Sequence, residues 1–208
     1  MRTRVALFLA LILCFTGSSF ADDLLIAKKG APLMSDDFSS PKGLANPWLM
    51  PKGKWEVKDG VLLGSEIKAD KHAAVLHYQK KNHNLIVQFD FELKGAQFLH
   101  LSFNHAKGHL WRLVITEKGM RLQKDKDKKN PKSKSEFVGE SLFAIKQGER
   151  HSVTVEIIGS QVAVQMDGNM ILKGTNPTFD AEKPNIRFIV RGESVLIDNV
   201  KAWEAEAQ

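Results

Sequence analysis

The residues best suited to chemistry gather in one short stretch, Phe98 to Arg112, which reads FLHLSFNHAKGHLWR. It holds three of the chain's seven histidines, and its candidate side chains are His100, Ser102, Asn104, His105, His109 and Arg112. Imidazole titrates near neutral pH, so histidine is suited to proton transfer and to metal binding. A guanidinium group can stabilise negative charge that develops during a reaction.

A pair of carboxylates precedes this stretch in LIVQFDFELKG. Side chains alternate across a strand, so Asp90 and Glu92 share the face opposite Phe89 and Phe91. By the same count, His100, Ser102 and Asn104 lie opposite Leu99, Leu101 and Phe103. We expect Lys94-Gly95 to turn the chain between two paired strands, which would bring the carboxylates beside His100.

Two interpretations of these polar faces stay open. In the first, the imidazole, carboxylate and amide groups converge in a working site, with His105 and His109 on the adjoining loop. In the second, they form an ordinary solvated sheet face whose polar side chains merely alternate. For the strand LWRLVI, periodicity does not decide whether the face of Arg112 or that of Trp111 is exposed to solvent.

The elements that must position these residues are strands. From Trp55 onward, short alternating apolar runs are separated by turn signals such as Asp59-Gly60, a dipeptide typical of tight hairpins. About ten such strands predict an all-β fold, a two-sheet antiparallel jelly-roll sandwich of the concanavalin-like type. We expect one domain over residues 35–203. Residues 22–34 are expected to form an irregular lead-in, with one edge strand near residues 35–38, and residues 204–208 a C-terminal tail.

The first 21 residues have the pattern of a secretory signal peptide, with Arg2 and Arg4, an apolar run and small residues leading to Ala21. We therefore expect an exported protein, periplasmic or extracellular, with no membrane span in the mature chain. Cys14 is the only cysteine and lies within the signal segment, so the mature chain has no disulfide.

The charge balance is modest. The full chain carries +6, from 30 basic and 24 acidic residues; without Arg2 and Arg4 it is 28 − 24 = +4. Much of the excess lies in KDKDKKNPKSKSE, residues 124–136, where no aromatic residue is interleaved. This pattern favours a solvated loop and argues against a nucleic-acid partner.

Several phrases occur in a familiar order: SDDFSS, GKWEVKDGVLLGSE, FDFELKGAQFLHLSF, SVTVEIIGSQVAVQMDGN and SVLIDNVKAW. Together they resemble the 3-keto-disaccharide hydrolase domain family, over about residues 35–203. The resemblance implies a concanavalin-like (laminin-G-like) jelly roll that acts on oxidised disaccharides or related glycosides. The E-x-D-x-x-E signature of sandwich-fold β-glucanases is absent, because FDFEL has only two carboxylates.

The chemistry that this resemblance implies begins with a 3-keto sugar, whose C2 proton is acidic. A base removes it, the C1 substituent leaves, and water then adds to complete a net hydrolysis. The implied roles are these: His100 or His105 as base, Asp90 or Glu92 as acid or metal ligand, and Ser102, Asn104, His109 and Arg112 as substrate-binding groups. A divalent metal is a possible cofactor, held by the histidines with Asp90 or Glu92.

Two other functions remain open for the same sequence. One is a non-catalytic carbohydrate-binding module that uses the same polar face. The other is an envelope interaction protein whose basic loop, residues 124–134, contacts an acidic polymer.

Overall fold

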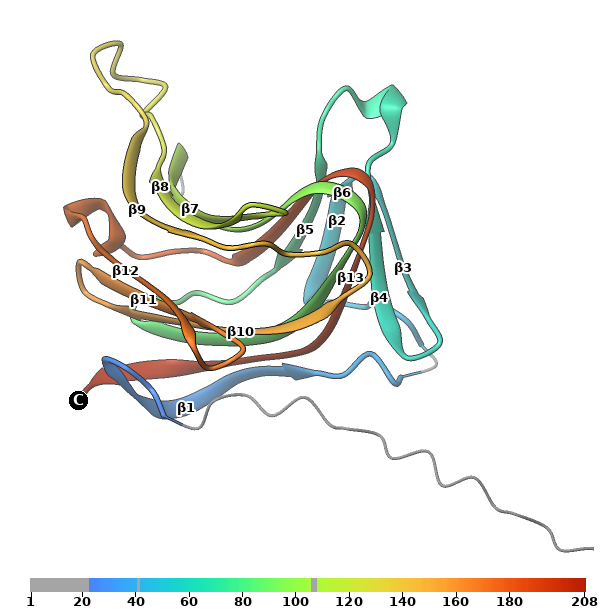
Figure 1. Ribbon diagram of the computed structural model, residues 1–208, viewed down its shortest axis with the longest axis horizontal. Coiled ribbons are helices and arrows are strands. Elements are labelled where there is room, and N and C mark those ends of the chain that lie inside the picture. Colours follow the sequence, from blue (N-terminus) through green and yellow to red (C-terminus); the bar gives the residue numbers. More distant parts are fainter. Residues whose placement is uncertain (1–22, 41, 106–107) are drawn as a thin grey trace, which may run out of the picture.

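The computed structural model describes residues 23–40, 42–105 and 108–208 (Figure 1). These residues form thirteen strands joined in one antiparallel sheet, and two 3-10 helices, η1 (Lys68–Asp70) and η2 (Pro177–Phe179). The strands are β1 (Ala27–Asp36), β2 (Trp48–Lys52), β3 (Lys54–Lys58), β4 (Val61–Ser65), β5 (Ala74–Tyr78), β6 (Leu85–His105), β7 (Gly108–Thr116), β8 (Gly119–Lys124), β9 (Glu136–Leu142), β10 (Arg150–Ile158), β11 (Gln161–Met166), β12 (Met170–Thr175) and β13 (Ile186–Ala207).

Two very long strands, β6 and β13, fold this sheet into two layers. They pair with each other along almost their whole length and bend together at the right of Figure 1. The lower layer has the order β12-β11-β10-β6-β13-β1 and uses the first half of β6 with the second half of β13. The upper layer has the order β9-β8-β7-β6-β13-β5-β2 and uses the opposite halves.

The core lies between the two layers. On either side of the bend, the odd-numbered side chains of β6, 85–93 in the lower layer and 99–103 in the upper layer, are fully buried in one cluster. Phe89 meets Phe188 of β13 edge to face across this core, with ring centroids 5.3 Å apart. Trp111 is also fully buried, so in β7 the face of Trp111 is the dry one and the face of Arg112 is the outer one. The predicted all-β jelly-roll sandwich is confirmed.

The bend between the layers corrects one sequence-based expectation. Lys94-Gly95 is not a hairpin turn, since β6 continues through it and stays paired with β13. Gly95 (φ 81°), opposite Ser194, and Gly192 (φ 105°), opposite Ala96, both have positive φ at the bend, where the register of β6 and β13 shifts. A bulge of this kind bends a strand without ending it, which alternation in the sequence does not reveal.

Hairpin turns elsewhere follow the prediction. Asp59 (φ 52°) and Gly60 (φ 75°) form the two-residue turn between β3 and β4. Both central residues have positive φ, as this tight turn requires.

Both ends of the predicted domain are more ordered than expected. Strand β1 covers residues 27–36 and pairs with β13, so it includes part of the expected lead-in and the start of the expected edge strand. The expected C-terminal tail is the end of β13, which continues up to Ala207. The fully buried carboxylate of Glu156 accepts hydrogen bonds from the backbone N–H groups of Leu25, Ile26 and Ala27. This long-range contact holds the segment in place and has no local sequence signal.

The expected signal peptide, residues 1–21, lies outside the described residues. Within the part of the chain that the structure describes, no helix has the length and apolar character needed to cross a membrane.

Candidate functional site

The candidate site is on the outer face of the upper layer, where three neighbouring strands present a row of polar side chains. Ser102 of β6 lies directly between Arg112 of β7 and Arg187 of β13. Ser102 is fully buried and Arg187 is 9% exposed, so this row is sheltered from solvent although it lies outside the core. Alternation in each strand puts all three side chains on one face.

A stacked aromatic pair lies next to this row. The rings of Phe98 and His100 are 4.0 Å apart and nearly parallel, and the guanidinium of Arg191 lies 5.9 Å from the centre of the Phe98 ring. His100 is 7% exposed, and burial, followed by the charges of nearby arginines including Arg112, lowers its pKa to about 3. His100 is therefore a neutral and weakly basic imidazole at physiological pH.

A cavity of about 210 Å³ opens over these groups. Its lining residues come from β6, β7, β13 and the segment before β5: His72, Ala73, Phe98, His100, His109, Arg112, Arg187, Ile189 and Arg191. A second cavity of about 330 Å³ shares His109 and Arg112 with the first and extends to Lys126 and Lys128. In Figure 1 this face lies between two projections, the loop from β8 to β9 at the upper left and the segment with η1 at the upper right.

The three arginines of the cavity differ in their partners. Arg112 donates to Oδ2 of Asp125 through Nε (3.0 Å) and Nη2 (2.5 Å). Arg191 forms an ion pair with Glu66, with 3.7 Å between Nε and Oε2. Arg187 makes no hydrogen bond or ion pair with any residue that the structure describes, and its buried Nε has no partner. Burial and then the neighbouring Arg112 lower the pKa of Arg187. Burying a charge without a bonded partner lowers the stability of a protein.

His109 and Asn104 form a second polar pair at the cavity. The Nδ1 of His109 lies 3.1 Å from the Oδ1 of Asn104, so Nδ1 carries the proton and donates to the amide oxygen. Nε2 is then the basic nitrogen. Burial, the largest effect, lowers the pKa of His109. His105 ends β6 beside Gly108, and residues 106 and 107 between them lie outside the described residues.

Asp90 and Glu92 do not join this site. They lie on the first half of β6, in the lower layer, whereas His100 lies on the second half. Both halves turn their odd-numbered residues toward the same core, so their even-numbered residues face opposite outer sides of the sandwich. The expected convergence of His100 with the two carboxylates is therefore wrong, because it depended on the hairpin at Lys94-Gly95.

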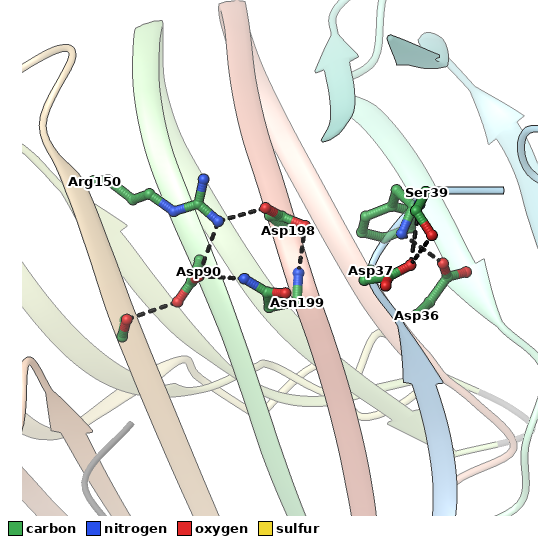
Figure 2. A network of polar contacts seen from close by, with 9 residues as sticks. Asp36, Asp37, Ser39, Asp90, Arg150, Asp198 and Asn199 are labelled. Atoms are coloured by element: carbon green, nitrogen blue, oxygen red, sulfur yellow. Dashed lines mark hydrogen bonds and ion pairs between the residues drawn. The ribbon is translucent and has the colours of Figure 1, made fainter. Parts of the chain in front are cut away.

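Asp90 belongs instead to a fully bonded polar network in the lower layer. Its buried carboxylate accepts hydrogen bonds from Ser152 (2.6 Å), Asn199 (2.8 Å) and Arg150 (2.9 Å), and Arg150 also binds Asp198 (2.5 Å). Figure 2 shows Arg150, Asp90, Asp198 and Asn199 turned toward one another from three neighbouring strands. A buried carboxylate that accepts from three protein donors is a structural group, since three of its about four acceptor positions are already occupied.

Glu92 lies beside this network, with 16% of its side chain exposed and Lys94 3.4 Å away. The expected metal ligands are thus divided between two faces. Among the described residues, no group of three His, Cys, Asp or Glu side chains is placed to hold a metal ion.

Sequence reasoning missed Arg187 and Arg191 as members of the site. The signal was present, since alternation in NIRFIVRG puts Arg187, Ile189 and Arg191 on one face. What was not visible is that β13 lies directly beside β6, more than eighty positions earlier in the chain.

Neither a protein-family model nor a curated protein matches this chain. Several solved structures do match it in fold. A protein of unknown function with a galectin-like fold from Bacillus subtilis has a TM-score of 0.69 and 13% identity, covering 88% of this chain and 100% of its own. The fold is a galectin-like jelly roll.

Carbohydrate-related proteins share this fold. A carbohydrate-binding module of Bacillus subtilis, CBM66, matches with a TM-score of 0.60 and 13% identity, covering 76% of this chain and 95% of the module. Porphyranase B from Zobellia galactanivorans matches with a TM-score of 0.61 and 13% identity, covering 83% of this chain and 91% of the enzyme. Identities this low show the common fold, and a site must be argued from its own residues.

Proposed function

We propose that this protein binds carbohydrate at the cavity of the upper layer, as a non-catalytic binding domain. The observation that carries the proposal is the combination of a flat ring and several hydrogen-bonding groups in one recess, with Phe98 stacked on His100 beside Arg112, Arg187 and the His109–Asn104 pair. Rings and polar groups of this kind suit a sugar, which has both C–H faces and hydroxyls. The carbohydrate-binding module and glycoside-cleaving enzymes with this fold support a carbohydrate ligand.

The binding function is favoured over catalysis by the placement of the carboxylates. Of the described residues, no acidic one lines the first cavity, and Asp125 in the second is paired with Arg112. Glycoside hydrolysis by the usual route needs two carboxyl groups on either side of the scissile bond. His100, with its pKa near 3, is a poor match to a base that works near neutrality.

The experiment is calorimetric titration of the mature chain with a panel of oligosaccharides. Phe98→Ala removes the ring at the cavity, and we expect it to weaken binding about tenfold while the fold stays intact. Phe137→Ala is the matched control, because Phe137 is 71% exposed on β9 and lines neither cavity. Equal losses in the two variants, or no binding by the unmodified chain to any glycan, would refute the proposal.

A second candidate is cleavage of 3-keto-glycosides, as the family resemblance implies. One observation favours it: the hydrogen bond from His109 Nδ1 to Asn104 fixes the tautomer in which Nε2 can accept a proton. In this route Nε2 would take the C2 proton, the C1–O bond would break with its electron pair on the leaving oxygen, and water would add to the resulting double bond. Arg112 would stabilise the enolate oxygen.

A turnover assay on a 3-keto-glucoside separates the two candidates. Release of the leaving group that disappears in His109→Gln, with the fold retained, would support the enzyme. Saturable binding without any product would leave the binding domain as the function.

Export is also part of the proposal. We infer that residues 1–21 direct the chain out of the cytoplasm and are removed, as their n-region, apolar run and small residues suggest. Sequencing the N-terminus of protein recovered from the periplasm or medium tests this, and finding Met1 retained there would contradict it.

A further inference from the structure

Arg187 is a buried cation whose partner is missing from the described chain. It is 9% exposed, it lines the cavity, and its Nε has no hydrogen-bond acceptor. Arg112 across Ser102 carries the same charge, and the Asp125 carboxylate, which attracts Arg187 from nearby, is already bonded to Arg112. Buried charges in proteins are normally paired, so this position calls for an anion.

Two further observations at the same place point to a ligand. The Oγ of Ser102, in the row between the two arginines, is buried and also has no partner. In addition, the described lining of the cavity contains three arginines and no acidic residue. An anion in the cavity would meet guanidinium donors of Arg187 and Arg112, which both line it.

We propose that the cavity binds the anionic group of an acidic glycan, a carboxylate or a sulfate ester, with Arg187 as its main partner. This inference rests on the proposed carbohydrate-binding function and narrows its ligand to charged sugars. Guanidinium groups bind planar carboxylate and sulfate-type oxygens through paired hydrogen bonds, which are stronger than those between neutral groups. The ring of Phe98 lines the same cavity with one face stacked on His100, so only its remaining surface, beside Arg191, is left to contact the sugar that bears the charge.

The adjoining cavity extends the same charge pattern. Its lining includes Lys126 and Lys128 from the loop between β8 and β9, next to Arg112 and His109. A chain of acidic sugars could therefore continue from Arg187 toward this loop and meet further cations. Exposed lysines attract anions over several ångströms but are screened by salt, whereas the buried arginine is screened less.

The test is titration calorimetry with matched pairs of ligands at fixed ionic strength. One pair is tetragalacturonate and its methyl-esterified form, and the other is a sulfated galactan tetrasaccharide and its desulfated form. We expect the charged member of at least one pair to bind about tenfold or more tightly than its neutral partner, as one charge-assisted contact allows. The pair that shows the preference identifies the anion as carboxylate or sulfate.

Variants of Arg187 test whether this residue causes the preference for the charged ligand. Arg187→Gln should abolish the preference for the charged ligand, and Arg187→Lys should restore part of it. Lys54→Gln makes the same change of charge at an exposed position of β3 and should leave the preference unchanged. If Arg187→Gln does not fold, as judged by circular dichroism, Arg191→Gln provides the comparison, because the Arg191 side chain is 44% exposed and tolerates change.

The outcomes separate the two proposals. Equal affinity for charged and neutral partners, or an undiminished preference in the arginine variants, would overturn the acidic-glycan inference while leaving carbohydrate binding in place. No binding to any oligosaccharide, charged or neutral, would overturn both.

Discussion

Two rows of polar side chains cross the same pair of strands, β6 and β13, and the structure uses them in opposite ways. In the lower layer, Ser152, Asp90 and Asp198 lie side by side on β10, β6 and β13. In the upper layer, Arg112, Ser102 and Arg187 do the same on β7, β6 and β13. Sequence alternation produces both rows equally well.

The difference lies in how completely each row is bonded. Asp90 has three donors, and Arg150 joins it to Asp198, so both carboxylates of the lower row are hydrogen-bonded inside the protein. The upper row leaves Arg187 Nε and Ser102 Oγ without partners. A polar group that is buried and satisfied maintains the fold, whereas one that is buried and unsatisfied costs stability and therefore suggests a ligand.

The largest expected effect is on the lower row. Asp90→Ala leaves Ser152 and Asn199 without their acceptor and removes one carboxylate from Arg150, so we expect a loss of about 3–5 kcal/mol in the free energy of unfolding. Urea denaturation measures it. Asp180→Ala is the control, since its carboxylate is half exposed and its ion pair among the described residues is with His83, and it should cost less than about 1 kcal/mol. A loss below 1 kcal/mol for Asp90→Ala would show that the network is not structural.

The next largest loss of stability is expected at the bend that separates the two rows. Gly192 has a positive φ, which residues other than glycine disfavour. A Cβ added to Gly192 would also lie 2.7 Å from the backbone O of Gly95, which is too close. We expect Gly192→Ala to cost about 2–3 kcal/mol. Gly60→Ala is the matched control, because Gly60 has positive φ but no atom within 4 Å of its added Cβ, and it should cost only about 1 kcal/mol. Equal costs in urea denaturation would mean that the bend is not crowded.

In the upper row, removing a charged side chain should not lower the free energy of unfolding as it does in the lower row. Arg187→Met removes an unpaired buried cation and keeps the apolar stem, so we expect stability to be unchanged or to rise by about 1 kcal/mol. Ligand affinity should fall in the same variant. A clear loss of stability in urea would mean that Arg187 has a structural partner and that the contrast between the rows is wrong.

The remaining prediction concerns the pH dependence of the upper row. The folded pKa of His100, about 3, lies below the ordinary value of 6.5, so the unfolded chain binds this proton more tightly. The neutral ring therefore contributes stability that is complete above pH 6.5 and is lost as pH falls toward 3. Thermal unfolding between pH 7 and pH 3 should show a shallower decline in His100→Gln. An identical decline would contradict the burial of a neutral imidazole.

Much of the fold could be predicted from sequence, because strand alternation and hairpin chemistry are local. The buried set Val87, Phe89, Phe91 and Leu93, the set Leu99, Leu101 and Phe103, and the Asp59-Gly60 turn follow from residue type and spacing alone. The candidate site was predicted only in part. Asn104, His109 and Arg112 lie together as a polar group, whereas the partnership of His100 with Asp90 failed.

The sequence by itself determined which side chains point toward the core and which point outward along each strand, since the period of two depends only on local geometry. Tertiary structure alone decided which outward rows share a face. Gly95 and Gly192 bend β6 and β13 instead of ending them, so residues ten positions apart in one strand reach opposite sides of the molecule, and Arg187 arrives beside Ser102 from the far end of the chain. Pairing between distant strands depends on the whole core, and no local pattern encodes it.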